Sequence, residues 1–279
     1  RDPLVLATKH SMAALPGDPN ARGNPRKNMM RSVADRLKRL DNDYIDLLYL
    51  HAWDFTTSVE EVMRGLDDLV RSGKVVYIGM SDIPAWQASR MQTIADLRGW
   101  SPLVALQVEY SLIERTVERE LIPMARDMGM GVIPWSPLGS GVLSGKYSRA
   151  DLVGDEAVAA AAGSRRNVAL ATGALNERGV TIAEEVAGIA RDVGATPAQV
   201  AIAWTLRNPT VTAPIVGART IAQLEDHLGA LDVRLADDQW GRLDAASAIA
   251  LGFPHELLKS PIMTEILFGG MPRITRTAG

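Results

Sequence analysis

Residues 44–50 read Tyr-Ile-Asp-Leu-Leu-Tyr-Leu, and an amphipathic stretch over residues 58–70 follows them. The first stretch is a short, mostly apolar run, which is typical of a buried strand. In the second, Ser58 and Glu61 form a capping box, and the apolar residues after them recur at helical spacing. A strand, a helix and then a further apolar run at residues 75–78 are the repeating unit of a parallel α/β fold.

The same alternation continues along most of the chain. We expect six strands, at residues 4–8, 44–50, 75–78, 103–108, 131–135 and 211–216. We expect helices at residues 25–40, 58–70, 84–97, 117–128, 181–193, 196–207, 220–231 and 237–246. The expected helix starts include two further capping boxes, Thr181 with Glu184 and Thr220 with Gln223, and the sequence Thr196-Pro197 with Gln199.

These units recur without a change of composition, so we expect one α/β domain over residues 1–279. A (β/α)8 TIM barrel needs eight strands. Because six are counted, and because Arg1 leads almost directly into an apolar run, we expect a barrel missing about its first two βα units. Residues 139–179, with the alanine-rich patch 157–162, are expected to form a long loop excursion, and residues 253–279 a C-terminal tail with turns at Gly269 and Gly270.

The composition narrows the function classes. Of the 279 residues, 47% are apolar and 23% charged, as in an ordinary enzyme, and the formal net charge of -3 does not favour nucleic acid or an anionic membrane. With no cysteine, disulfides and thiolate catalysis are excluded, and a cytoplasmic location is expected. No apolar run approaches the ~20 residues that span a bilayer. A small-molecule substrate is the expected partner.

Every expected strand ends in a polar or aromatic residue, and in an α/β barrel the chemistry gathers at the C-terminal ends of the strands. These endings are Lys9, His51, Ser81 with Asp82, Gln107 with Glu109, Trp135 with Ser136, and Gly217 with Arg219. At the sixth ending, the backbone N–H groups of the next helix and the Arg219 guanidinium would form an anion site.

Simpler interpretations stay open for each of these residues. Lys9 and Arg219 could be solvated surface side chains, and His51 and Gln107 could each form a hydrogen bond with a neighbouring residue. Ser81 and Asp82 are good N-cap residues for the next helix, and Trp135 could be packing alone.

Seven motifs, in order along the chain, resemble the aldo-keto reductases. They are Leu6-Ala-Thr-Lys9, Asp43-Tyr-Ile-Asp-Leu with Tyr49-Leu-His51, Gly73-Lys-Val with Tyr77-Ile-Gly-Met-Ser81, Leu106-Gln-Val-Glu-Tyr110, Trp135-Ser-Pro-Leu-Gly139, Gly145-Lys-Tyr147 and Pro214-Ile-Val-Gly-Ala-Arg-Thr220. The tail sequence Gly252-Phe-Pro-His is similar to that of bacterial members related to the potassium-channel β-subunits.

The resemblance implies a barrel that binds NADPH across its rim and reduces aldehydes or ketones by hydride transfer. Members use an aspartate, a tyrosine that donates the proton, a lysine and a histidine. Lys9 matches the lysine and His51 the histidine, while the aspartate and tyrosine belong to a preceding strand that this sequence lacks. Tyr49 and Tyr110 are the nearest substitutes, but neither stands at the family's position.

The resemblance also implies a set of cofactor residues. Ser81, with Gln107, matches the carboxamide contacts, and Trp135 matches the aromatic residue that stacks on the nicotinamide. The pyrophosphate loop and the adenosine phosphate segment are matched by Ser136, Leu138, Ser140, Gly217, Arg219, Gln223, Asp226 and His227. Asp82 and His227 each replace a usual asparagine, and Val76 replaces a common arginine. Arg219 favours NADPH over NADH.

Three functions compete. The first is an NADPH-dependent carbonyl reductase, in which Trp53, Asp54 and the excursion after residue 139 help to shape the substrate pocket. The second is a nucleotide-binding regulatory subunit that senses redox state, or an inactive fragment. The third, a metal-dependent hydrolase, is discounted because the four histidines form no His-x-His pair. We expect no metal, and negligible turnover by these 279 residues alone.

Overall fold

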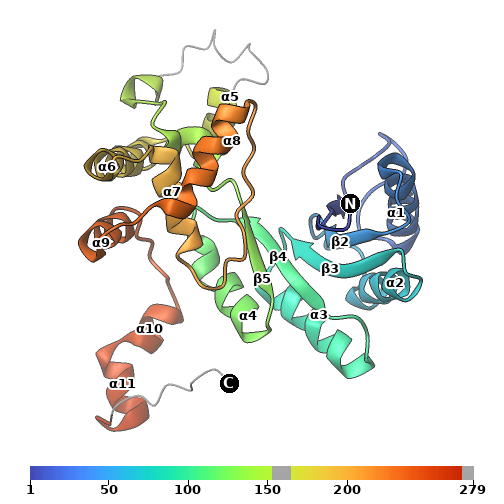
Figure 1. The fold of residues 1–279 in the computed structure, drawn as a ribbon. Helices are drawn as coiled ribbons and strands as arrows, with labels where there is room; N and C mark the ends of the chain where they lie inside the picture. The colour runs from blue at the N-terminus through green and yellow to red at the C-terminus, as the bar shows by residue number, and fades with distance from the viewer. Residues whose placement is uncertain (153–164, 272–279) are drawn as a thin grey trace.

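The computed structural model describes residues 1–152 and 165–271. Its centre is a parallel sheet in which each strand pairs with its neighbour in sequence, in the order β1-β2-β3-β4-β5 (Figure 1). The strands are β1 (Ala7–His10), β2 (Ile45–Leu50), β3 (Val75–Ser81), β4 (Leu103–Glu109) and β5 (Gly131–Trp135). The expected α/β class is therefore confirmed, and sequential parallel pairing is the order that a (β/α)8 barrel also has.

Helices connect and flank these strands. The first four follow strands β1 to β4 in turn, and are α1 (Arg26–Leu40), α2 (Val59–Arg71), α3 (Ala85–Arg98) and α4 (Leu121–Asp127). After β5 come α5 (Arg165–Ala171), α6 (Glu177–Val193), α7 (Pro197–Leu206), α8 (Ile221–Leu228), α9 (Asp237–Ala246), α10 (His255–Lys259) and α11 (Pro261–Phe268). Short 3-10 turns are η1 (Thr116–Glu118), η2 (Gly139–Ser144), η3 (Arg149–Leu152) and η5 (Gly229–Asp232). None of the helices in the described ranges is long and apolar enough to cross a membrane.

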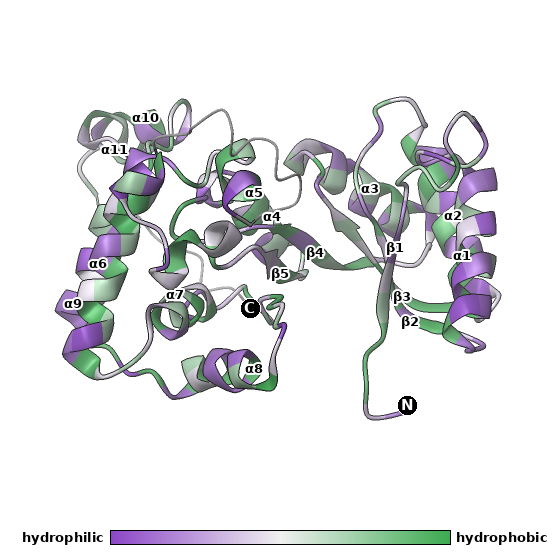
Figure 2. Cartoon of the chain, turned by 90° about the horizontal axis from the view of Figure 1, so that it is seen from above, coloured by the Kyte–Doolittle hydropathy of each residue, from purple (hydrophilic) through white to green (hydrophobic). Residues whose placement is uncertain are grey.

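The core lies between the sheet and the helices that follow its strands. Helix α2 shows why: Ser58 Oγ accepts the Glu61 N–H at its start, and its apolar residues recur on one face. On that face Val62 and Leu66 are fully buried, and they belong to the same cluster as Leu48 of β2. Figure 2 shows the result from above, with α6 and α9 at one end of the molecule, α1 and α2 at the other, and β4 and β5 between them.

The first strand begins later than expected. We expected residues 4–8, but β1 runs Ala7–His10, because it takes its register from β2, where Ala7 pairs with Leu47 and Lys9 with Tyr49. Leu4 and Val5 lie beyond that pairing and are exposed. Lys9 therefore stands inside the strand.

The expected sixth strand is not a regular strand of the described structure. Val211 forms an isolated parallel bridge with Val132, and the Thr212 and Ile215 N–H groups donate to carbonyl oxygens of β5. Two prolines interrupt the ladder, since Pro134 of β5 and Pro214 of the segment have no N–H to donate. Residues 211–216 thus follow β5 without completing a ladder.

The start of α6 was also predicted wrongly. The helix begins at Glu177, where the Asn176 side chain accepts the Gly179 N–H, and Thr181 lies inside it with its hydroxyl donating to the Glu177 carbonyl. The Thr196–Gln199 capping box of α7 is present in both directions. At α8, Thr220 accepts the Gln223 N–H, but the Gln223 side chain bonds to the N–H of Arg219, so only half of that box forms.

The remaining boundaries differ less. The helix expected at residues 117–128 is the shorter α4 preceded by η1, and the helix expected to reach residue 231 ends at Leu228, followed by η5. The expected excursion contains η2, η3, α5 and the start of α6, while its alanine-rich patch 157–162 lies outside the described residues. The tail forms α10 and α11, with Gly269 ending the latter, and its last residues, 272–279, also lie outside them.

Candidate active site at the carboxyl edge of the sheet

The chain turns in a strained conformation as it leaves three of the strands. Ser11, Asp82 and Ser136 directly follow β1, β3 and β5, and their φ angles are 119°, 43° and 56°. Ser140, in η2, has a φ of 55°. Positive φ costs an L-residue free energy, and such residues cluster where a side chain must be aimed precisely. This edge is where the sequence predicted a site.

Several buried polar atoms at this edge have no hydrogen-bond partner among the described residues, and two of them are neighbours. Ser81 at the end of β3 pairs in register with Gln107 of β4, so both side chains lie on one face of the sheet. Ser81 is fully buried and Gln107 is 3% exposed, yet the Ser81 hydroxyl and the Gln107 amide oxygen are both unsatisfied. Buried polar groups are rarely left unpaired, so two neighbouring ones indicate a ligand that completes them. Neither Ser81 nor Asp82 caps α3, whose N-cap is Pro84.

Asp82 connects this pair of atoms to the end of β5. Its carboxylate accepts the indole N–H of Trp135 at 3.0 Å, and its carbonyl oxygen accepts the backbone N–H of Trp53 at 3.3 Å. Trp53 is buried, with its indole nitrogen unpartnered among the described atoms. The aspartate that replaces the family's asparagine thus serves as an acceptor that orients Trp135.

Lys9 and His51 lie within electrostatic reach of each other and of Asp82. Burial lowers the pKa of the Lys9 ammonium, and the Asp82 carboxylate opposes that shift. Burial also lowers the pKa of His51, and the Lys9 charge lowers it further. His51 is therefore neutral at pH 7, with one ring N–H to donate. The structure brings these two predicted residues together at the edge where β1 and β2 end.

Glu109 is a half-buried carboxyl at the end of β4 that the sequence analysis noted without assigning a role. Burial raises its pKa to about 7, and the neighbouring carboxylates of Glu114 and Asp82 add to that shift. It pairs in register with Trp135. A carboxyl that titrates near neutrality at such an edge is a typical feature of a functional site.

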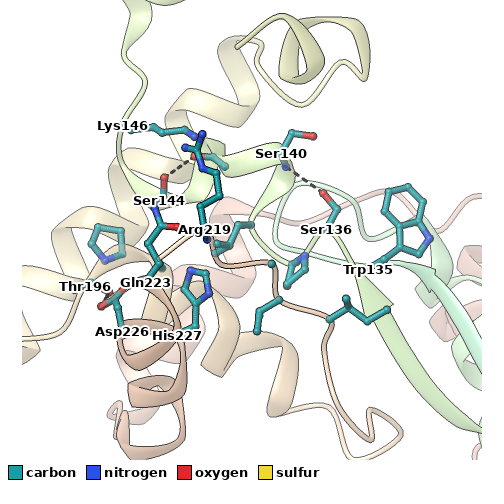
Figure 3. Close-up of a pocket in the computed structure, with 18 of the residues that line it drawn as sticks. Trp135, Ser136, Ser140, Ser144, Lys146, Thr196, Arg219, Gln223, Asp226 and His227 are labelled. Atoms are coloured by element: carbon teal, nitrogen blue, oxygen red, sulfur yellow. Dashed lines mark hydrogen bonds between the residues drawn. The ribbon is translucent and has the colours of Figure 1, made fainter. Parts of the chain in front are cut away.

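A pocket of about 820 Å³ extends from Trp135 toward helix α8 (Figure 3). It contains most of the residues that the resemblance assigned to the cofactor. These lining residues are Trp135, Ser136, Leu138, Ser140, Gly217, Arg219, Gln223, Asp226 and His227. Its size suits a drug-sized ligand.

Two positively charged side chains, Lys146 and Arg219, lie at one end of this pocket. Lys146 and Arg219 both line it, and in Figure 3 both side chains extend toward the same end. A Cβ on Gly141 would lie 2.7 Å from the Lys146 Nζ, so the glycine makes room for the lysine. Within the described ranges no carboxylate pairs with either cation. Lys146 belongs to the Gly145-Lys-Tyr147 motif, which follows the Trp135 loop closely in sequence but carried no predicted role of its own.

Hydrogen bonds between α7 and α8 hold another part of the pocket lining in place. The Thr196 hydroxyl donates to Asp226 at 2.9 Å, and the Gln199 side chain donates to the Asp226 carbonyl oxygen at 3.0 Å. Asp226 is thus engaged by helix α7. His227 beside it has its Nδ1 buried without a partner among the described atoms, and is the adjoining group with a free bonding position.

Asp54 has a different use. Its two carboxylate oxygens accept the N–H groups of Asn24, Thr56 and Thr57 and the Thr57 hydroxyl, all at 2.7–2.9 Å. A Cβ on Gly23 would lie 2.7 Å from the same carboxylate. Asp54 therefore ties two loops together, and its place in the substrate pocket stays a prediction.

Neither tyrosine near this edge is prepared to act as an acid. Burial raises the pKa of Tyr49 to about 12. Tyr110 is 3% exposed, its hydroxyl bonds to Glu118 at 2.9 Å, and burial raises its pKa as well. Both shifts run against proton donation at neutral pH.

The polar carboxyl edge of the sheet and the adjoining pocket lie where an α/β barrel places its ligand site. The sequence matches the profile of the Aldo/keto reductase family over residues 1–248, and the chain belongs to this family.

Its relatives include oxidoreductases. Norsolorinic acid reductase B of Dothistroma septosporum is 35% identical over 94% of this chain and 65% of its own length. The aryl-alcohol dehydrogenase [NADP(+)] of Phanerodontia chrysosporium is 34% identical over 92% of this chain and 68% of its own. The uncharacterized oxidoreductase YrpG of Bacillus subtilis is 39% identical over 84% and 69%. The chain spans slightly less than two thirds of the length of the norsolorinic acid reductases.

Proposed function

We propose that this chain binds NADPH along the carboxyl edge of its sheet and belongs to an enzyme that interconverts carbonyl compounds and alcohols. The observation that carries the proposal is the neighbouring pair of unsatisfied buried atoms, the Ser81 hydroxyl and the Gln107 amide oxygen. A carboxamide offers one acceptor and one N–H2 donor, and the two atoms match it, since a hydroxyl can donate and an amide oxygen accepts. Trp135 at the adjoining strand end supplies an aromatic face for the ring.

The other end of the pocket supports a phosphorylated nucleotide. Lys146 and Arg219 place two cations there, and an arginine fork suits a phosphate group. An extra phosphate on the adenosine ribose is what distinguishes NADPH from NADH. A relative whose printed name includes NADP(+) agrees with this choice. His227 and Gln223 on α8 would adjoin the adenine.

When bound, the nicotinamide supplies the hydride, and the chain's own residues prepare the carbonyl oxygen. His51, neutral at pH 7, would donate its ring N–H to that oxygen and orient the carbonyl. The Lys9 ammonium would stabilise the negative charge that develops on it, all the more because the site is partly buried. Trp53, buried beside Asp82, would limit the access of water.

The proposal is tested by titrating the purified chain with NADPH and NADH, following tryptophan fluorescence, and then adding an aryl aldehyde as a first substrate. The aryl class comes from the printed name of one relative. We expect NADPH to bind at least tenfold more tightly than NADH, and Ser81→Ala to weaken both. Failure of NADPH to bind would overturn the proposal.

A second function, binding of the nucleotide with little turnover, is favoured by one observation. Tyr49 and Tyr110 both have raised pKa values, so neither offers an easily released proton. We therefore expect these 279 residues to bind NADPH but to reduce the aldehyde slowly. Rapid oxidation of NADPH by the chain alone would contradict this expectation.

A further inference from the structure

Asn24 lies at the end of the loop that follows β1, directly before Pro25, the N-cap of α1. An asparagine at the start of a helix commonly caps it, yet no side chain caps α1. The Asn24 side chain is fully buried and turns instead to the loop that follows β2. It thereby joins two loops at the carboxyl edge of the sheet.

The Asn24 amide bonds to the backbone on both sides of Trp53. The amide nitrogen donates to the Ala52 carbonyl oxygen at 3.0 Å, and the amide oxygen accepts the Asp54 N–H at 2.8 Å. Because a carbonyl cannot donate and an N–H cannot accept, these two bonds fix which way the amide faces. The Trp53 N–H itself donates to the Asp82 carbonyl oxygen, so the backbone is held at three successive residues.

The second hydrogen of the amide connects Asn24 to His51. It is donated to the Ser11 hydroxyl oxygen at 3.0 Å, and the same oxygen accepts the His51 N–H at 3.3 Å. That N–H also donates to the His10 carbonyl oxygen at 2.8 Å. Ser11 has a φ of 119°, a conformation that costs an L-residue free energy and that the surrounding bonds must offset. One buried side chain thus fixes the backbone at both His51 and Trp53.

We propose that Asn24 is a positioning residue of the candidate active site, which fixes residues 51–54 so that the His51 side chain points at the carbonyl oxygen of the substrate and Trp53 lies beside it. The inference rests on the proposed function, because it gives Asn24 a part in binding the carbonyl compound and none in binding the nucleotide. Since Asn24 is fully buried, it touches neither ligand and acts only through the backbone of the loop.

The test is Asn24→Ala, with one measurement made in the absence of any ligand. NMR follows the titration of the His51 ring, whose signals are identified by their loss in His51→Gln. Burial and the Lys9 and Arg36 charges lower the pKa of His51, and the Asp82 carboxylate opposes them. When the loop is no longer fixed, the ring gains access to water, and we expect its pKa to rise toward 6.5.

The second measurement uses benzaldehyde and the chain loaded with NADP+, which has no hydride to transfer. Calorimetric titration gives the affinity for the aldehyde. We expect benzaldehyde to bind about tenfold more weakly to Asn24→Ala, as for the loss of one hydrogen bond to the carbonyl oxygen. NADPH and 2′,5′-ADP, its adenosine end, should each bind within twofold of the wild type.

Asn28→Ala is the matched control. Asn28 is also buried, on the first turn of α1, and its side-chain bonds go to Gly23 and Ser32. Its removal should lower the melting temperature but leave the pKa of His51 and the benzaldehyde affinity unchanged. If Asn24→Ala does not fold, Ser11→Ala provides the same test, since it removes the oxygen that accepts the His51 N–H.

An unchanged pKa of His51 together with an unchanged benzaldehyde affinity in Asn24→Ala would overturn the inference. Equal effects in Asn28→Ala would do so too, because a general loosening of the fold would then explain both. If the wild-type chain bound neither NADPH nor benzaldehyde, the proposed function would fail. The pKa of His51 would then still decide whether Asn24 fixes the loop.

Discussion

Arg219 and Lys146 are the residues on which the proposed preference for NADPH depends. Both line the phosphate end of the pocket without a carboxylate partner among the described residues. We predict that Arg219→Ala weakens NADPH binding ten- to a hundredfold, the equivalent of about 1.5–3 kcal/mol for a charge-assisted hydrogen bond, and leaves NADH binding nearly unchanged. Titration calorimetry with both nucleotides measures this. Arg234→Ala, an exposed arginine bonded only to backbone carbonyls, is the control.

Burial of His10 makes the free energy of unfolding depend on pH. His10 is 1% exposed, both ring nitrogens lack a partner within the described ranges, and burial lowers its pKa to about 4. Because the folded pKa lies below the unfolded value of 6.5, the unfolded chain takes the proton first. Stability is therefore full above pH 6.5 and is lost as the pH falls toward 4, by up to about 3 kcal/mol from this residue.

We predict that His10→Phe matches the wild type in urea unfolding at pH 7.5 and exceeds it at pH 4.5. The half-buried Glu109 gives a slope of the opposite sign, since its pKa is raised to about 7, but it contributes equally to both proteins. Parallel pH profiles for the two proteins would show that His10 is not the cause.

At the residue scale the sequence identified which side chains gather at the edge, and missed how several are used. Ser81, Gln107 and Trp135 lie at or near the ends of β3, β4 and β5, as expected from the apolar runs, whereas their roles toward a cofactor stay predictions. The use of Asp54 as a loop tie depends on Asn24, thirty residues away, so no local pattern predicted it.

At the scale of the element, the N-terminus of α7 supports part of the pocket wall. Thr196 caps α7 by accepting the Gln199 N–H, and its hydroxyl also donates to Asp226 of α8. We predict that Thr196→Ala lowers the free energy of unfolding by about 1–2 kcal/mol. It should also weaken NADPH binding severalfold, because Asp226 and helix α8, which Arg219 precedes, lose a fixed point.

Urea unfolding and nucleotide titration test this prediction together. Thr93→Ala is the control, since the Thr93 hydroxyl bonds only to the Ser89 carbonyl on the outside of α3. A Thr196→Ala protein that is destabilised but binds NADPH as the wild type does would limit Thr196 to capping.

Elements were predicted best where one local signal decides them. Helix α2 and β2 follow from apolar spacing and a capping serine. The predicted sixth strand does not form because Pro134 of β5 and Pro214 of the segment 211–216 each lack an N–H to donate to the ladder. Helix α6 begins four residues before the predicted Thr181 because the Asn176 side chain caps it, and Glu184 pairs with Arg149 instead of joining a capping box.

At the scale of the whole molecule, the site draws on two parts of the chain. Ser81 and Gln107, the proposed carboxamide contacts, lie at the ends of β3 and β4, whereas Arg219 and His227 lie in or beside α8. We predict that NADPH slows amide hydrogen exchange in both regions, and that 2′,5′-ADP slows it around α8 and η2 only. Protection confined to α8 with NADPH would mean that the nicotinamide does not reach the sheet. The α/β class followed from the repeated units, and that one ligand spans both regions stays a prediction drawn from the family resemblance.

Asp82, Ser136 and Ser140 have positive φ angles, so selection for heat resistance would favour substitutions within the candidate site. Glycine at any of the three would relieve backbone strain, so a library screened for melting temperature alone would favour it. Exchange of Asp82 would release the Trp135 indole, and exchange of Ser136 would release the Ser140 N–H. Selection for stability alone would therefore act against the proposed nucleotide site, and a screen that retains function has to select for binding at every round.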